Sequence, residues 1–262
     1  MKLFPPRIEL LGTADAVAER AAHLVIATLR RTGVTTLGLA TGLTMTPLYA
    51  RLVAANRAGE ISFRNTFSFN LDEYVGVPAN SPGSFRAFMQ RHLFGLIDIE
   101  PGRTHLPDGT ARNMVAEARR YEALIAAAGG IELQLLGIGA NGHIGFNEPG
   151  SEFSSRTRDV RLDEATRLGH AGQFPDRDSA PERAITMGIG TILDARGILL
   201  LATGAEKAAA IAAAVEGPLT TACPASALRL HGNVQILCDE AAASALARRP
   251  DNGARRAQGH RI

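Results

Sequence analysis

Residues 35–44 read Thr-Thr-Leu-Gly-Leu-Ala-Thr-Gly-Leu-Thr, a short apolar run followed by a turn that contains glycine. From Pro47 to Val53 the apolar residues then recur at helical spacing. The same order returns at Ile131 to Ile138, before a Gly-rich turn, and at Gly197 to Ala202, before the Ala-rich stretch Ala205 to Val215. Strands that alternate with helices in this way predict a mostly parallel sheet with helices on both faces.

Working outward from these segments, the remaining sequence completes the same pattern. Further strands are expected at Phe67 to Leu71 and, in an edge or late position, at Val234 to Cys238, and helices at Ala14 to Arg31, Pro82 to Phe94 and Ala111 to Ala128. Ser81, as a cap, and Pro82, at the first helical position, give the second helix a start signal. We therefore expect an α/β fold with a single Rossmann-like domain.

The expected domain covers residues 1–247 and contains one segment of different character. Gly150 to Arg183 is polar, charged and dotted with glycine and proline, and such long segments are usually functional. We interpret it as a mobile lid, although a pair of short surface helices without a role is the alternative. Residues 248–262 form a basic tail with five arginines against one aspartate, which predicts a disordered end.

Composition excludes several classes of protein. Of the 262 residues 45% are hydrophobic, enough for a buried core, yet no run approaches the roughly 20 apolar residues of a membrane helix. Met1 to Leu11 lacks the order of a secretory signal, so we expect a cytoplasmic protein. The net charge of +2 includes the tail, and the body has no basic stripe with interleaved aromatic residues, so no nucleic-acid partner is expected. Cys223 and Cys238 are expected to be reduced thiols in or near the core.

Unusual polar residues follow several of the predicted strands, where ligands bind in open α/β sheets. They are Thr41 and Thr44, Asp72, Asn141 with His143 and Glu148, and Thr203 with Lys207. The turn Thr41-Gly42-Leu43-Thr44 places backbone N–H groups and hydroxyls at a helix start, which favours an anion. It is not a Walker A loop, and a simple tight turn capped by Thr44 or Thr46 remains open.

Gly137 to Gly142 formally match the dinucleotide motif GxGxxG, but Gly145 and Pro149 disfavour the helix that this motif requires. The loop suits acid–base chemistry better. It delivers His143 and, five residues later, Glu148, and a histidine beside a carboxylate can exchange a proton at neutral pH. A purely structural histidine is the alternative.

Asp72 and Glu73 follow a predicted strand directly. If the extended conformation continues, their side chains point in opposite directions, so at most one of them faces a shared pocket. The alternative is a pair of solvated loop acids. The seven histidines show no HxxxH pair and no cluster with cysteine, so we expect neither a metal nor another cofactor.

With these residues assembled, the chain closely resembles the glucosamine-6-phosphate deaminase family, within the group that also includes 6-phosphogluconolactonases. The resemblance runs from Met1 to about Leu246. It rests on LATGLT (39–44), FNLDEYVG (69–76), GIGANGHIGFNEP (137–149), SRTR (155–158), TMGIGT (186–191) and Leu230-His231-Gly232. Lactonases resemble the long middle motif only as far as Gly142-His143.

The resemblance implies deamination and isomerisation of a 6-phosphorylated 2-amino hexose, glucosamine 6-phosphate first. It implies that His143, oriented by Asn141 and Glu148, opens the sugar ring, and that Asp72 moves a proton from C2 to C1. Gly137, the turn Thr41-Gly42-Leu43-Thr44 and Lys207 would bind the substrate, with the turn and the lysine on its phosphate.

Three departures from the family pattern matter. Many relatives carry Asp at the position of Asn141, so we expect Asn141→Asp to move the histidine-dependent limb of the pH–rate profile upward. The family's phosphate-binding lid arginine is absent from His170-Ala171-Gly172-Gln173-Phe174, and Arg167, Arg177 and Arg183 are the candidates to replace it. Val160 stands where allosterically activated relatives carry Lys, so no activation by an amino-sugar phosphate is expected.

Two other functions stay open. In a lactone hydrolase His143 would activate water and Asp72 would have no carbon proton to move. A non-catalytic sugar-phosphate sensor is the third reading, and the retained proton-transfer residues disfavour it. The sequence does not decide which epimer of the amino sugar is the substrate. It also does not decide between a monomer and a homo-oligomer.

Overall fold

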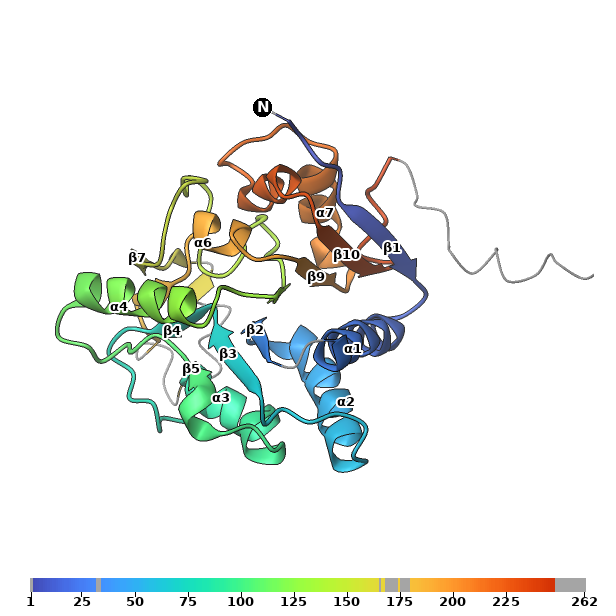
Figure 1. The fold of residues 1–262 in the computed structure, drawn as a ribbon. Coiled ribbons are helices and arrows are strands. Elements are labelled where there is room, and N and C mark those ends of the chain that lie inside the picture. Colours follow the sequence, from blue (N-terminus) through green and yellow to red (C-terminus); the bar gives the residue numbers. More distant parts are fainter. Residues whose placement is uncertain (1, 32–33, 165, 168–173, 175–179, 248–262) are drawn as a thin grey trace, which may run out of the picture.

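The computed structural model describes residues 2–31, 34–164, 166, 167, 174 and 180–247, and a seven-stranded parallel sheet forms its centre (Figure 1). The strands lie side by side in the order β1 (Arg7–Leu11), β10 (Val234–Asp239), β9 (Ile198–Ala202), β6 (Leu133–Leu136), β2 (Thr35–Leu39), β3 (Thr66–Asn70) and β5 (Thr104–His105). All six pairings are parallel. The α/β class and the parallel sheet predicted from the sequence are confirmed.

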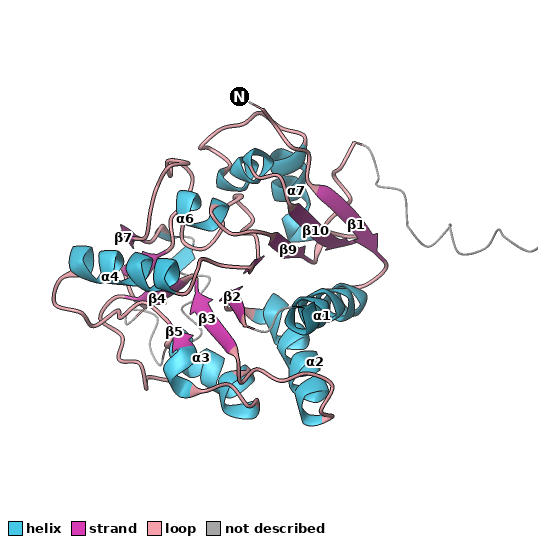
Figure 2. Cartoon of the chain, viewed as in Figure 1, coloured by secondary structure: helices cyan, strands magenta, loops and turns pink. Residues whose placement is uncertain are grey.

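The helices surround this sheet (Figure 2). They are α1 (Ala14–Arg31), α2 (Thr46–Arg57), α3 (Phe85–His92), α4 (Met114–Ala127), α6 (Ile189–Leu193) and α7 (Ala208–Val215), with short 3₁₀ turns η1 (Leu43–Met45), η2 (Phe94–Leu96), η3 (Pro101–Arg103), η6 (Ala205–Lys207) and η7 (Pro224–Leu230). Helix α1 has the predicted bounds, and it packs against α2 and β10. Because helices cover the sheet, the five residues of β2 and of β9 are all buried.

The start of helix α3 differs from the prediction. The sequence predicted a start at Pro82 with Ser81 as the cap, but the helix begins at Phe85. Ser84 is the actual cap, since its hydroxyl accepts a hydrogen bond from the N–H of Ala87 at 3.0 Å. Two serines within four residues offered equivalent cap signals, and the contacts of the helix decide between them.

The order of the strands places a switch point between β2 and β6. From β2 the chain continues outward through β3 to β5, and from β6 it continues in the other direction through β9 to β10. The loops that leave the carboxyl ends of β2 and β6 therefore diverge, and they open a crevice at that edge. Strand β10 lies one position in from the edge because β1, which the sequence analysis did not identify, pairs outside it.

A second, three-stranded antiparallel sheet lies beside the first. It consists of β4 (Asp72–Tyr74), β8 (Arg183–Thr186) and β7 (Arg158–Arg161). The sequence did not predict this sheet, since β7 reads Arg-Asp-Val-Arg and shows little apolar character. Strand β7 lies inside the segment 150–183 that we interpreted as a lid. Within that segment, residues 165, 168–173 and 175–179 lie outside the described residues, as do 248–262.

Candidate active site

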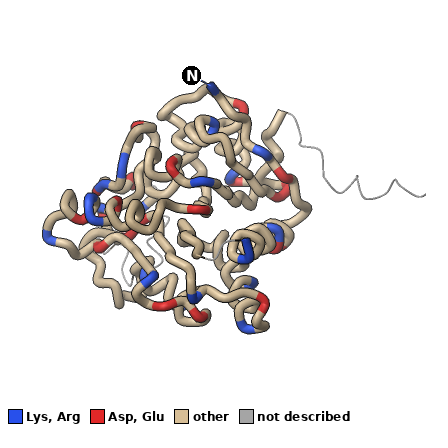
Figure 3. Tube along the Cα trace, viewed as in Figure 1, with Lys and Arg blue, Asp and Glu red and all other residues tan. Residues whose placement is uncertain are grey.

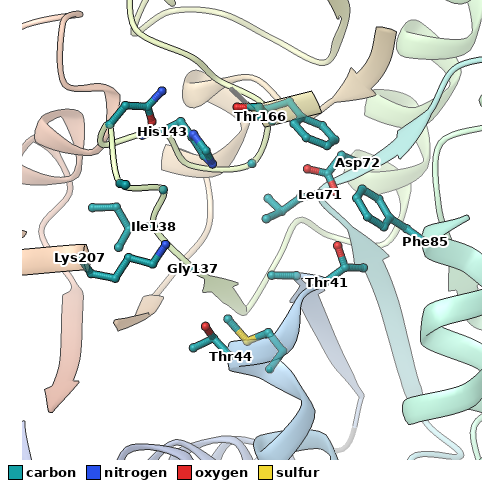
Figure 4. Close-up of a pocket in the computed structure, with 17 residues that line it drawn as sticks. Thr41, Thr44, Leu71, Asp72, Phe85, Gly137, Ile138, His143, Thr166 and Lys207 are labelled. Carbon is teal, nitrogen blue, oxygen red and sulfur yellow. Dashed lines mark hydrogen bonds between the residues drawn. The ribbon is translucent and has the colours of Figure 1, made fainter. Parts of the chain in front are cut away.

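A cavity of about 470 Å³ lies at the switch point of the parallel sheet. Its walls come from the carboxyl ends of β2 and β6, from the start of β4, and from Lys207 before α7. Asp72 and His143 project into it from opposite sides, and Lys207 and Thr44 lie at the end away from Asp72 (Figure 4). The fold thus brings together chemically active residues that are more than 150 positions apart in the sequence.

The loop that carries His143 is shaped by its glycines. The N–H of Gly139 donates to the carbonyl of His143 at 2.9 Å, and Gly142 has a φ of 85°, which few other residues adopt. A Cβ atom at Gly139 would lie 2.2 Å from Cε1 of His143. Glycine is required at position 139 because the imidazole folds back over this backbone. No helix follows the loop, so the dinucleotide motif is excluded, as predicted.

Glu148 lies behind the imidazole and receives several donors. Its Oε2 lies 3.4 Å from His143 Nδ1 and accepts a hydrogen bond from Asn141 Nδ2 at 2.7 Å, while its Oε1 accepts from Thr166 Oγ1 at 2.5 Å. Burial by itself would raise the pKa of Glu148, but His143, Thr166 and Asn141 outweigh it and lower this pKa to about 2. Glu148 is therefore ionised at any working pH and can hold a proton-bearing imidazole nitrogen.

Asn141 acts on this group differently from the prediction. The resemblance implied that Asn141 orients the imidazole, but its Oδ1 accepts from the backbone N–H of His143 at 3.1 Å and its amide donates to Glu148. Among the described residues no hydrogen bond reaches the ring nitrogen Nδ1 of His143, and its 3.4 Å separation from Glu148 Oε2 is longer than a good hydrogen bond. Asn141 thus contacts the backbone of the loop and the carboxylate of Glu148, and Glu148 approaches the ring.

Asp72 faces the cavity without such donors. It is 5% exposed, and within the described residues no hydrogen bond reaches its carboxylate. Burial, followed by the charge of Glu73, raises the pKa of Asp72 to about 8. A carboxylate with such a pKa is a much stronger base than an ordinary aspartate, which suits the removal of a proton from carbon.

The neighbouring acid points the other way, as the sequence predicted. Residues 72–74 form strand β4, and Asp72 lines the main cavity while Glu73 lines a separate one. Both are buried, so the alternative of two solvated loop acids is wrong. The alternation of an extended strand was enough to place them on opposite faces.

The predicted anion-binding residues divide into two groups. Thr41, Thr44, Gly137 and Lys207 line the cavity, whereas Gly42 and Leu43 do not. Gly42 has a φ of 114° and precedes η1, and the side chain of Leu43 is 88% exposed. Only the hydroxyl-bearing ends of this turn therefore face the space in which a ligand would lie.

Lys207 follows a turn that is fixed by hydrogen bonds. The N–H of Gly204 donates to both carboxylate oxygens of Asp239, at 3.2 and 3.1 Å, and this fixes the turn that leads to Lys207. In the part of the chain that the structure describes, no carboxylate forms an ion pair with Lys207. Its ammonium group is available for an anionic ligand.

Some cavity residues were not predicted from the sequence. Phe85 and Phe146 form an apolar wall with a ring-centroid distance of 5.9 Å, and Thr166 donates to Glu148. Phe85 is the first residue of a helix, and Phe146 carries no polar signal, so neither stood out. Thr166 lies in the segment interpreted as a lid, which is the one signal that could have found it.

Two of the three arginines that could replace the lid arginine form ion pairs outside the cavity. Arg167 approaches Glu182 at 3.5 Å, and Arg183 donates to Asp159, so these two are engaged outside the cavity. Arg177, Gly172 and Gln173 lie outside the described residues.

Three further findings concern features outside the cavity. Among the described residues, no three His, Cys, Asp or Glu side chains come together as the ligands of a metal ion would. None of the described helices has the length and apolarity to cross a membrane. Cys223 and Cys238 are buried free thiols, as predicted.

Comparison with known proteins gives consistent matches over most of the chain. Residues 12–237 match the family described as glucosamine-6-phosphate isomerases/6-phosphogluconolactonase. The chain is 55% identical to a glucosamine-6-phosphate deaminase of Shewanella loihica, covering 92% of this chain and 90% of the relative. It is 50% identical to one of Cellvibrio japonicus, covering 92% and 91%.

Solved structures give the same picture. A monomeric glucosamine-6-phosphate deaminase superposes with a TM-score of 0.89 at 43% identity, covering 91% of this chain and 99% of that one. A 6-phosphogluconolactonase of Trypanosoma brucei superposes with a TM-score of 0.73 at 25% identity, covering 93% and 100%. Both branches of the family share the fold, and the sequence lies nearer to the deaminases.

Proposed function

Because the chain belongs to the family of glucosamine-6-phosphate isomerases and 6-phosphogluconolactonases, we propose that it is a glucosamine-6-phosphate deaminase. It converts glucosamine 6-phosphate and water to fructose 6-phosphate and ammonia. The observation that carries this proposal is the placement of a raised-pKa aspartate, Asp72, across one cavity from His143 and its partner Glu148. These two groups can serve the two proton transfers that the reaction needs.

The first transfer opens the sugar ring. His143, held against Glu148, accepts the proton of the C1 hydroxyl and delivers it to the ring oxygen, which leaves an aldehyde at C1. The permanent charge on Glu148 stabilises the imidazolium that exists between these two steps. The 3.4 Å separation of His143 and Glu148 is that of the unliganded site, and such contacts commonly shorten when substrate binds.

The second transfer moves hydrogen from C2 to C1. Asp72 takes the C2 proton, which the neighbouring carbonyl acidifies, and returns it to C1, while a proton of the amino group passes to the C1 oxygen. The product is a ketose imine. Water adds to its C2=N bond, and ammonia leaves to give the ketone. The apolar wall formed by Phe85 and Phe146 keeps Asp72 poorly solvated, which keeps it strongly basic.

The phosphate of the substrate binds at the opposite end of the cavity. Thr44 offers a hydroxyl group there, Lys207 offers a positive charge, and Gly137 lets the ligand approach the backbone, while Thr41 lines the cavity on the side of Asp72. We propose that residues 1–247 form one catalytic domain.

The charges on the surface indicate which partners the protein can bind, and the substrate indicates the compartment in which it acts. Lys and Arg are interspersed with Asp and Glu along the drawn trace, and many form ion pairs such as Arg31 with Glu132 (Figure 3). This mixed pattern does not favour a nucleic-acid partner. Phosphorylated sugars are charged metabolites that do not cross membranes unaided, so we propose that the protein acts in the cytoplasm.

The alternative is hydrolysis of a sugar-phosphate lactone, and Asp72 argues against it. That reaction moves no proton from carbon, so it gives no role to a buried, strongly basic carboxylate. The test is an ammonia-release assay with 6-phosphorylated 2-amino hexoses of different configuration, run beside hydrolysis of 6-phosphogluconolactone. We expect ammonia from glucosamine 6-phosphate, and Asp72→Asn abolishes it. Lactone hydrolysis without ammonia release would refute the proposal, and binding without turnover would indicate a sensor.

A further inference from the structure

We propose that Glu73 is a positioning residue for the reaction: its carboxylate, bound to the N-terminus of helix α3, keeps a fixed negative charge behind Asp72 and holds Phe85 in the cavity wall. This inference rests on the proposed role of Asp72 as the carbon base. Glu73 itself does not touch the substrate, since it lies on the other face of strand β4.

The contacts of Glu73 are those of a fixed anion. Its side chain is buried, with the residue 3% exposed, and Oε1 accepts hydrogen bonds from the backbone N–H groups of Phe85 at 2.9 Å and Tyr74 at 3.0 Å. Oε2 accepts from the N–H of Arg86 at 2.9 Å. Phe85 and Arg86 are the first two residues of α3, whose unpaired N–H groups and dipole favour a negative charge at this point.

The surroundings of Glu73 on its own face are mixed in charge. It lines a second cavity of about 360 Å³ together with Arg86 of α3, His105 of β5, Asp108 and Arg120 of α4. Arg120 is already paired with Glu117, at 2.6 Å. Burial raises the pKa of Glu73 above its usual value, and the three backbone donors and then Arg86 offset part of this rise. Arg86 is thus the main cation that stabilises the charge on Glu73.

The two adjacent acids differ in which one can hold a charge. Glu73 has three N–H donors, and a carboxylate with such donors is stabilised in its ionised form. Asp72 has no hydrogen-bond donor within the described residues. When two buried acids repel each other, the proton settles on the one without donors. The charge therefore stays on Glu73 and the proton stays on Asp72, which makes Asp72 a strong base when it ionises.

The same hydrogen bonds connect Glu73 with the wall of the active site. Phe85, whose N–H Glu73 accepts, lines the main cavity, and its ring packs 4.5 Å from that of Tyr74 and 5.9 Å from that of Phe146. The side chain of Ser84 caps a different N–H, that of Ala87. Glu73 is therefore the acceptor that fixes the first residue of α3, and with it the ring that shields Asp72 from water.

The test is the pH profile of Glu73→Gln. We expect the acidic limb of log kcat/KM to move down by about one pH unit, because the charge that opposes ionisation of Asp72 is gone. We also expect kcat on the alkaline plateau to fall about tenfold, because the base is weaker. The substrate's own amine and phosphate titrate identically in both proteins, so the difference isolates the enzyme.

Glu117→Gln is the matched control. Glu117 is also a buried carboxylate, 6% exposed, and it accepts hydrogen bonds from the N–H of Asp108 and from Arg120, but it does not line the main cavity. The Glu117→Gln variant should be less stable than the wild type, but the acidic limb of its log kcat/KM profile should not move. Glu73→Asp keeps the charge but is too short to keep all three N–H contacts, so its limb should stay in place while kcat falls.

A second measurement covers the case in which Glu73→Gln does not fold. In the wild-type protein, the side-chain carboxyl ¹³C signal of Asp72 should titrate with a midpoint near pH 8, and that of Glu73 should titrate at a lower pH, because its carboxylate accepts three backbone hydrogen bonds. The inference would be overturned if Glu73 titrated at a higher pH than Asp72. It would also be overturned if a folded Glu73→Gln variant still released ammonia and the acidic limb of its log kcat/KM profile did not move. If the proposed function itself were wrong, the wild-type protein would release no ammonia.

Discussion

Asp72 and Glu148 are two buried carboxylates beside the same cavity, with exposed fractions of 5% and 8%, and their pKa values move in opposite directions. The pKa of Asp72 is raised to about 8 and that of Glu148 is lowered to about 2. Burial raises both, so it cannot by itself explain why the pKa of Glu148 is lowered. The two carboxylates differ in the hydrogen bonds that they accept. Glu148 accepts hydrogen bonds from Asn141 and Thr166 and lies 3.4 Å from His143 Nδ1, whereas within the described residues no hydrogen bond reaches Asp72.

The comparison shows how one cavity supports two kinds of acid–base chemistry. A carboxylate surrounded by donors stays charged and stabilises a neighbouring cation, while a carboxylate against apolar walls keeps its proton until the pH is high and then binds protons strongly. Amide substitutions should lower activity at both sites but change stability in opposite senses at the two sites.

The largest effect is expected for Asp72→Asn. Activity should fall by about 10³-fold, since no other group can carry the C2 proton. Stability should rise, because the amide removes a buried acid. The folded protein holds a proton on Asp72 that the unfolded chain releases above its ordinary pKa of 3.8, so the stability from this group is full at low pH and is lost as the pH rises through about 8.

Thermal unfolding between pH 6 and 9 checks this prediction. The variant should unfold at a higher temperature than the wild type, with the gap widest above pH 8, where the free-energy difference should reach about 1–3 kcal/mol. In the wild-type enzyme, kcat/KM should rise between pH 6 and 8 as Asp72 ionises. A variant less stable than the wild type at pH 9 would contradict the donor-free environment inferred for Asp72.

Glu148→Gln should show the converse pattern. Activity should fall by about 10²-fold, because the imidazolium of His143 loses its counter-charge. Stability should also fall, by about 2 kcal/mol, because Asn141 and Thr166 lose a charged acceptor. The folded pKa of Glu148 lies below its ordinary 4.5, so its stabilisation is present above that pH and disappears as the pH falls through about 2. The unfolding temperatures of the two proteins should converge on acidification, and equal stability at pH 7 would count against the hydrogen-bond network.

The sequence was sufficient to find these carboxylates but not to tell their environments apart. Asp72 and the loop of His143 were identified because both follow strands of the parallel sheet, and the strand period placed Glu73 on the other face. The pKa values could not be predicted, because the donors to Glu148 and the walls around Asp72 come from residues that are distant in the sequence.

The remaining errors have the same origin. Strand β1 and the sheet of β4, β8 and β7 were missed because their short, charged sequences become strands only through pairing with neighbours. The start of α3 was misplaced because Ser81 and Ser84 look alike locally, and the contacts of Glu73 with Phe85 exist only in the fold. Periodicity predicts which segments form layers, whereas register and caps depend on tertiary contacts.

Gly139→Ala should disturb the imidazole without touching either carboxylate. The added Cβ would lie 2.2 Å from Cε1 of His143, so the ring must move away from Glu148. We expect kcat to fall about tenfold or more, since a shift of about 1 Å in a catalytic group can reduce the rate 10²-fold. Gly12→Ala is the control, because nothing lies within 4 Å of its added Cβ. If both variants keep full activity, the ring is not confined as the structure shows.

The smallest effect is expected for Thr166→Val, which removes one of the donors to Glu148 and keeps the shape of the side chain. The loss of a 2.5 Å hydrogen bond to an ionised carboxylate should cost about 1 kcal/mol in the transition state, or about fivefold in kcat, with the pKa of Glu148 rising toward its ordinary value.

Thr157→Val makes the same chemical change outside the cavity and separates activity from stability. Thr157 Oγ1 donates to Glu122 Oε1 at 2.5 Å, the same distance as in the Thr166–Glu148 pair, but neither residue lines the main cavity. Both substitutions should lower the unfolding temperature by a similar amount, because each leaves a carboxylate with one donor fewer. Only Thr166→Val should lower kcat, because only its carboxylate faces an imidazole that must carry a proton. An equal loss of activity in the two variants would mean that general loosening of the fold, and not the donors to Glu148, sets the rate.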